Sequence, residues 1–183
     1  MVKQDVTEGW ICTFMDAMPF NLEFEITDLR IIEMLPRHCG LEVEMVEAAQ
    51  KILGIAPPFD YSAVNPRIYT MLEKIRNGEE IEADHWCPAA ALGVLWCWQL
   101  VHYHKWAWCA VSQHWWETIA VTDPSKRCAI MPIQYFRWIT NDTGEIGAKG
   151  TTIVSKWPKD YLDDIARGTL PIDPRREFNC ICQ

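Results

Sequence analysis

The apolar run Cys87–Val101, CPAAALGVLWCWQLV, decides the fold of this 183-residue chain. An α-helix through this run has almost no polar face, and a helix that is apolar all round is normally buried on every side. We therefore predict a central helix from about His85 to Tyr103, capped by Asp84. At 15 residues the run is short of the roughly 20 that cross a bilayer, so we expect a buried core helix and no membrane association.

Tryptophan is concentrated around this run, because eight of the ten tryptophans lie between Trp86 and Trp138. Such density marks either an aromatic core or a binding face for a protein or a small ligand. A stacking site for single-stranded nucleic acid would add basic residues, and few stand nearby. Neighbouring residues on a strand face opposite sides, so Trp115 or Trp116 is expected to face outward unless both sides are covered.

Apolar periodicity and turn residues predict further elements on both sides of the central helix. Ahead of it we expect a strand over Phe20–Ile26 and helices over Asp28–Leu35, Leu41–Leu53 and from Asn65-Pro66 to Asn77. After it we expect strands over Trp106–Val111, Trp116–Thr122, Arg127–Met131 and Thr151–Ser155, and helices over Pro132–Ile139 and Asp160–Arg167. This order predicts an α+β fold, with a buried central helix packed on a small antiparallel sheet beside N-terminal helices. We expect one domain over residues 1–183, with an irregular tail at 169–183.

The net charge of −8 is unevenly distributed along the chain. Residues 1–84 carry 16 acidic and 7 basic residues, whereas residues 85–140 carry 2 acidic and 4 basic residues. Phosphate binding requires a basic face, so we expect no nucleic-acid partner. An acidic half attracts a basic protein partner, and Glu42, Glu44 and Glu47 share one predicted helix.

The eight cysteines lack the paired CxxC spacing of a zinc ribbon. Several stand inside apolar runs, where a free thiol behaves as a small hydrophobe. His102 and His104 are two residues apart, and such side chains point apart on a helix. Because the first residues also lack the apolar stretch of a secretory signal, we expect a cytoplasmic protein with reduced thiols, without a metal or a cofactor.

One constellation predicts a cysteine enzyme. Cys87 falls at the start of the central helix, where unpaired N–H groups favour a thiolate, and His114 precedes a predicted strand. Papain-like and transglutaminase-like enzymes have this arrangement of cysteine and histidine. The segment from His114 to Asp123-Pro124 resembles the transglutaminase-like pattern, which implies that Asp123 orients the imidazole. The Gly-x-Cys of that superfamily is absent, because His85-Trp86 precede the cysteine.

A second resemblance covers residues 89–139. The segments that carry it are Ala89-Ala-Ala-Leu-Gly93, Trp106-Ala-Trp108, Ala120-Val-Thr-Asp-Pro124, Ala129-Ile-Met-Pro132 and Tyr135-Phe136. This pattern is similar to that of small bacterial domains of unknown function, for which no activity is agreed. Many small acidic bacterial proteins of this kind accompany secreted toxins as immunity proteins, which implies such a role here.

The sequence thus leaves three functions open, and a small-ligand sensor built on the clustered tryptophans is the third. The first is a protein-binding protein, in its most concrete form an immunity protein or inhibitor that occludes a basic bacterial toxin. Its binding residues would be Glu42, Glu44 and Glu47 with Trp115 or Trp116, and exposed aromatic residues would equally suit a homodimer. The alternative is the cysteine enzyme that uses Cys87, His114 and Asp123.

Overall fold

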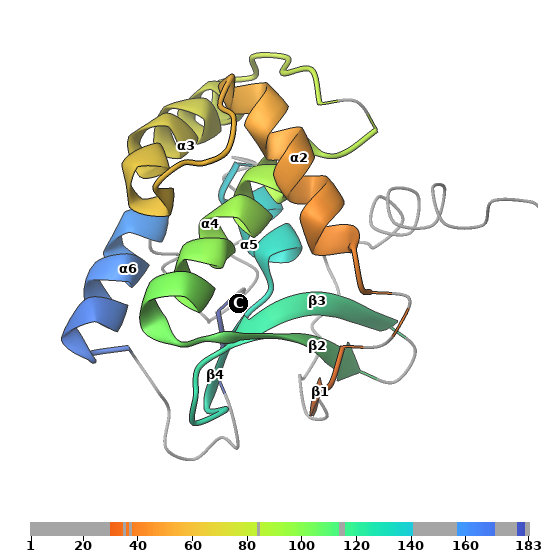
Figure 1. Cartoon of the computed structure of the whole chain (residues 1–183), viewed down its shortest axis with the longest axis vertical. Coiled ribbons are helices and arrows are strands. Elements are labelled where there is room, and N and C mark those ends of the chain that lie inside the picture. Colours follow the sequence, from red (N-terminus) through yellow and green to blue (C-terminus); the bar gives the residue numbers. More distant parts are fainter. Residues whose placement is uncertain are drawn as a thin grey trace, which may run out of the picture.

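The computed structural model describes residues 30–34, 36, 38–83, 85–113, 116–140, 157–170 and 179–181. Helices gather above one sheet, as Figure 1 shows, so the α+β class is confirmed. The elements in chain order are β1 (Arg30–Ile32), α2 (Leu41–Leu53), α3 (Tyr61–Arg76), α4 (Pro88–His104), β2 (Ala107–Gln113), β3 (Trp116–Thr122), β4 (Cys128–Ile130), α5 (Pro132–Thr140), α6 (Pro158–Arg167) and β5 (Asn179–Ile181).

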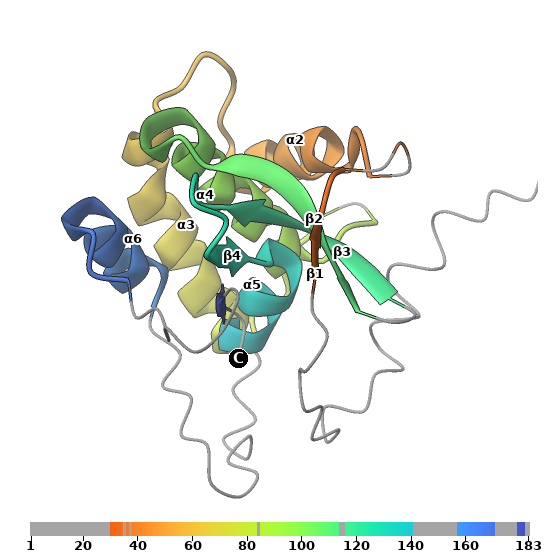
Figure 2. The same ribbon diagram turned by 90° about the horizontal axis from the view of Figure 1, so that it is seen from below.

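The five strands pair in the order β1-β2-β3-β4-β5. The long hairpin β2–β3 forms the middle of the sheet, with Ala107 opposite Thr122 at one end and Gln113 opposite Trp116 at the other. The strands from β1 to β4 are antiparallel, whereas β5 runs parallel to β4. Seen from below, the sheet lies against one side of the helices (Figure 2).

The central helix is confirmed as α4, which contacts α2, α3, α5 and β3. Every side chain from Ala89 to Cys97 is buried. The helix begins at Pro88, three residues later than predicted, with Cys87 as its N-cap residue. A proline fits this first helical position because its missing N–H has no intrahelical partner there. At the other end Lys105 adopts a left-handed conformation, φ 59°, and turns the chain into β2.

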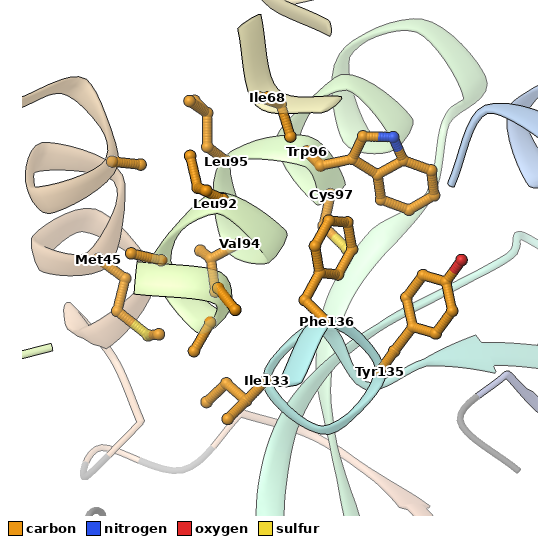
Figure 3. Close-up of a cluster of buried hydrophobic side chains, with 14 of the residues drawn as sticks. Met45, Ile68, Leu92, Val94, Leu95, Trp96, Cys97, Ile133, Tyr135 and Phe136 are labelled. Carbon is orange, nitrogen blue, oxygen red and sulfur yellow. The ribbon is translucent and has the colours of Figure 1, made fainter. Parts of the chain in front are cut away.

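Close packing of α4 against α5 depends on Gly93. A Cβ atom built on Gly93 would lie 2.7 Å from the Phe136 ring and 2.9 Å from the carbonyl oxygen of Pro132. Figure 3 shows the Phe136 side chain beside Cys97 and Trp96 in this part of the core. The glycine therefore sets the distance between the two helices.

Two predictions of local structure are wrong. The expected helix Asp28–Leu35 contains strand β1 instead, because Arg30–Ile32 pair with the edge of β2. Helix α3 begins at Tyr61 rather than at Asn65-Pro66, since the carboxylate of Asp60 accepts a hydrogen bond from the Ser62 backbone N–H and caps the helix there.

Of the other predicted elements, two are confirmed with their bounds, one segment differs, and three predictions concern residues that are not described. The helix over Leu41–Leu53 and the strand over Trp116–Thr122 are confirmed with the expected bounds. Residues 179–181 form strand β5 inside the segment expected to be an irregular tail, because they pair with β4. The predicted strands Phe20–Ile26 and Thr151–Ser155 lie outside the described residues, as does the proposed cap Asp84.

Gly93→Ala tests the packing of α4 on α5. The added methyl group meets the Phe136 ring and a backbone oxygen, and overpacking of this kind costs about 1–3 kcal/mol. We expect the free energy of unfolding, measured by urea denaturation, to fall by this amount. Ala166→Ser, at an exposed position of α6, should stay within about 0.5 kcal/mol of the parent. Equal stability of both variants would contradict the packing argument.

Candidate aromatic binding site

Six rings gather where the end of α4 meets the start of α3 and the start of β2. We call them, together with Asp60, the aromatic patch: Phe59, Tyr61, Trp98, His102, Tyr103 and Trp108. Three rings come from the last two turns of α4, two flank Asp60 at the start of α3, and one stands on β2. Segments more than 40 residues apart in the sequence therefore build one surface.

The rings of the aromatic patch are in direct contact. His102 stacks on Tyr61 with ring centroids 4.6 Å apart and an interplanar angle of 26°. Trp98 meets Trp108 edge to face at 5.7 Å. The patch reaches the surface at His102 and Tyr103, and the Tyr103 side chain is 54% exposed. The half-buried rings of Tyr61 and Trp98 thus contact the exposed His102, which in turn contacts Tyr103.

Asp60 provides the charge at this surface. Its Oδ1 atom accepts hydrogen bonds from the Ser62 backbone N–H at 2.9 Å, the Ser62 hydroxyl at 2.8 Å and the Tyr103 hydroxyl at 2.8 Å. The bonds from Ser62 and Tyr103 hold the pKa of Asp60 below its usual value, because they stabilise the ionised form. The hydrogen bond from the Tyr103 hydroxyl to Asp60 also raises the pKa of Tyr103. Asp60 is therefore an exposed carboxylate at neutral pH.

A buried pair of amides fixes α3 against α4 next to the aromatic patch. The side chain of Asn65 donates to Gln99 at 2.9 Å, and that of Gln99 donates back to Asn65 at 3.1 Å. Gln99 is 3% exposed, so the reciprocal bonds satisfy polar groups that burial would otherwise leave unpaired. The pair positions the start of α3, which carries Asp60 and Tyr61, relative to the last turns of α4.

The predicted acidic residues lie on α2. Glu44 and Glu47 are exposed, and so is the side chain of Val43, at 49%. Glu42 is partly buried and accepts a hydrogen bond from the Gly40 backbone N–H at 3.1 Å, so it also has a local role at the start of the helix. Trp115 and the side chain of Trp116 lie outside the described residues.

The structure does not bring Cys87 and Asp123 together. Cys87 is at the start of α4, whose 17 residues span about 25 Å, whereas Asp123 follows Thr122 of β3, which pairs with Ala107 just after the helix ends. The Asp123 carboxylate serves the β3–β4 turn, where it accepts from the backbone N–H of Ser125 at 3.0 Å and of Cys128 at 2.6 Å. His114 lies outside the described residues.

A different cysteine stands at the start of a helix near β3. Cys39 is exposed and directly precedes Gly40, the N-cap residue of α2. Its neighbour His38 is 6% exposed and places Nε2 3.3 Å from Oε1 of Glu117 on β3. His114 precedes Glu117 by three positions in the sequence. Among the described residues, this contact ties the start of α2 to the strand that follows the candidate histidine.

Within the described segments, no group of three or more His, Cys, Asp or Glu side chains is placed to hold a metal ion. His102 is stacked on Tyr61, and burial lowers the pKa of His104. Burial raises the pKa of the Cys97 thiol, which suits a core residue. No described helix combines the length and apolar character needed to cross a membrane.

Comparison with known proteins gives no relative. No family model matches the chain, and neither a curated protein nor a solved structure does.

Sequence reasoning did not single out Asp60 or Tyr103. Asp60 carried a usable signal, because an aspartate before Tyr61-Ser62 is a good N-cap, but Asn65-Pro66 offered a competing helix start. Tyr103 carried none, since a helix that is apolar all round does not reveal which of its last residues reach solvent. Only the position of α3 beside the end of α4 brings the two together.

Asp60→Asn tests the charge at the aromatic patch through pH. Asparagine keeps a capping oxygen but has no charge. Because the pKa of Asp60 is lowered by folding, its ionised form stabilises the native state above the unfolded pKa, and this contribution disappears as pH falls through the folded pKa. We expect the gap in urea midpoint between the parent and Asp60→Asn to be largest above about pH 5 and to shrink toward pH 2. A gap independent of pH would refute this role.

Proposed function

We propose that this chain is a protein-binding protein whose interface is the aromatic patch. The observation that carries the proposal is the exposed Tyr103 ring beside the Asp60 carboxylate. Tyrosine side chains are enriched at energetically dominant positions of interfaces, since they bury much apolar area and keep a polar tip. The Tyr103 ring contacts His102 and its hydroxyl is bonded to Asp60, and this prior ordering lowers the entropy lost on binding.

The charge of the chain favours a basic partner. Asp60 is exposed within the patch, and Glu44 and Glu47 are exposed on α2 beside Val43. Acidic groups of this kind raise the rate of encounter with a basic surface and lose influence as salt is added. We infer that Asp60 and Tyr103 anchor the partner, while Glu44 and Glu47 steer it.

The concrete form of this proposal is an immunity protein or inhibitor of a bacterial toxin, acting in the cytoplasm. Such a protein works by occlusion, because a bound inhibitor of ordinary interface size covers the partner's active surface. This form rests on the acidic charge and on the resemblance of residues 89–139 to small bacterial domains.

Tyr103→Ala tests the interface. A tagged chain purified gently from its own host is examined by native mass spectrometry, and a stoichiometric partner is then isolated for affinity measurements. Loss of a central aromatic anchor costs about 2 kcal/mol or more, so we expect Tyr103→Ala to weaken binding about 30-fold. Val43→Ala, at an exposed apolar residue on α2, serves as the matched control and should change binding little. Unchanged affinity of Tyr103→Ala would exclude the patch as the interface.

The second candidate function is a thiol enzyme, and the position of Cys39 favours it. We infer that Cys39 is a better nucleophile candidate than Cys87 because it is exposed at the start of α2 and next to His38, which contacts β3. In this scheme His114 acts as the base that activates the thiol. Asp123 has no part in it, since its carboxylate serves a turn.

Thiol labelling with iodoacetamide near pH 6, followed by peptide mapping, tests this enzyme. An activated Cys39 should label faster than Cys87 and faster than the buried Cys97. His114→Ala should slow the labelling of Cys39, whereas His85→Ala, at an exposed histidine, should leave it unchanged. If His114→Ala has no effect on the labelling rate, the thiol enzyme is ruled out.

A further inference from the structure

The two oxygens of the Asp60 carboxylate are in different situations. Oδ1 accepts three hydrogen bonds, two from Ser62 and one from Tyr103, and the Ala63 backbone N–H also stabilises the ionised group. Oδ2 accepts none within the part of the chain described, although Asp60 is exposed. One oxygen of an ionised carboxylate is therefore open to a donor from outside, and the other has no remaining capacity.

Among the residues that the structure describes, no cationic side chain pairs with this oxygen. Lys105 stands two residues after Tyr103 and is exposed, yet it makes no ion pair with Asp60 in the described structure. Arg67, further along α3, has its guanidinium 3.5 Å from the carbonyl oxygen of Leu53. The negative charge at the aromatic patch is thus left for a group from a partner.

An exposed tyrosine ring adjoins the carboxylate. The Tyr103 hydroxyl donates to Oδ1, so its exposed ring lies beside the carboxylate. His102 is next to it and stacks on Tyr61. A cation placed here gains from the carboxylate and from the negative faces of the tyrosine rings, and an aliphatic chain gains from covering an exposed ring.

The geometry of Asp60 distinguishes between the two common protein cations. A guanidinium binds a carboxylate best through two parallel N–H bonds, which require both oxygens. An ammonium is a compact charge that needs only one acceptor. Because Oδ1 already accepts three hydrogen bonds, a guanidinium can form only one of its two parallel bonds, to Oδ2. An ammonium needs only one acceptor and can form its full interaction with Oδ2.

We propose that the aromatic patch recognises a primary ammonium, namely a lysine side chain of the partner. The Nζ atom donates to Asp60 Oδ2, and the methylene stem lies across the Tyr103 ring. This inference rests on the proposed protein-binding function and names the group that the interface selects.

Capped tetralysine and tetraarginine peptides test the inference with the full chain. Binding is measured by isothermal titration calorimetry at one fixed low ionic strength. We expect tetralysine to bind more tightly than tetraarginine, and Asp60→Asn to weaken tetralysine about three- to tenfold, the size of an exposed ion pair with a cation–π contact. Glu73→Gln removes the same charge from an exposed position of α3 and should have a smaller effect.

The titration distinguishes failure of the lysine selectivity from failure of Asp60 as the binding group. Tighter binding of tetraarginine that is still weakened by Asp60→Asn would overturn the ammonium selection and leave the interface intact. Equal effects of Asp60→Asn and Glu73→Gln on both peptides would overturn the inference itself. Tyr103→Leu keeps an apolar side chain without a ring face, so it repeats the test if Asp60→Asn unfolds. The proposed protein-binding function fails separately, on unchanged partner affinity of Tyr103→Ala.

Discussion

The rest of the structure depends on the burial of helix α4 on all sides. Its residues from Ala89 to Cys97 are all buried, and a helix of this composition is not stable in water unless other elements cover it. Helices α2, α3 and α5 and strand β3 supply that cover. Gly93 then sets how closely α5 approaches, because any side chain there meets Phe136 and the backbone at Pro132.

The candidate binding site is a consequence of where this buried helix ends. The last turn of α4 leaves the core at His102 and Tyr103, which are exposed. The aromatic residues at this end of α4 lie next to the start of α3. There Asp60 caps α3 and also accepts a hydrogen bond from the Tyr103 hydroxyl. The buried Asn65–Gln99 pair keeps the two helices in register at this point. The residue that caps α3 is thus also the carboxylate that we propose binds the partner.

Two cysteines at helix starts have different surroundings in the fold. Cys39 and Cys87 both stand at the beginning of a helix, and sequence reasoning chose Cys87 because it begins the central helix. The choice overlooked that β2 runs back from the far end of α4, so the Asp123 turn falls at that end. The contact of His38 with Glu117 places the start of α2 next to the first part of β3. Strand pairing decides which helix start faces which strand end, and it is not visible in local periodicity.

The sequence by itself determined the α+β class, the central helix, the helix over Leu41–Leu53 and the strand over Trp116–Thr122. These elements carry strong local signals, namely continuous apolar composition, one apolar helical face and a strand bounded by turn residues. Only the tertiary structure decided that Arg30–Ile32 form an edge strand, that Asn179–Ile181 pair with β4, and that Asp60 meets Tyr103. Each of these features is stabilised by contacts between segments far apart in the chain. The sequence pattern of one short segment does not show which distant segment will pack against it.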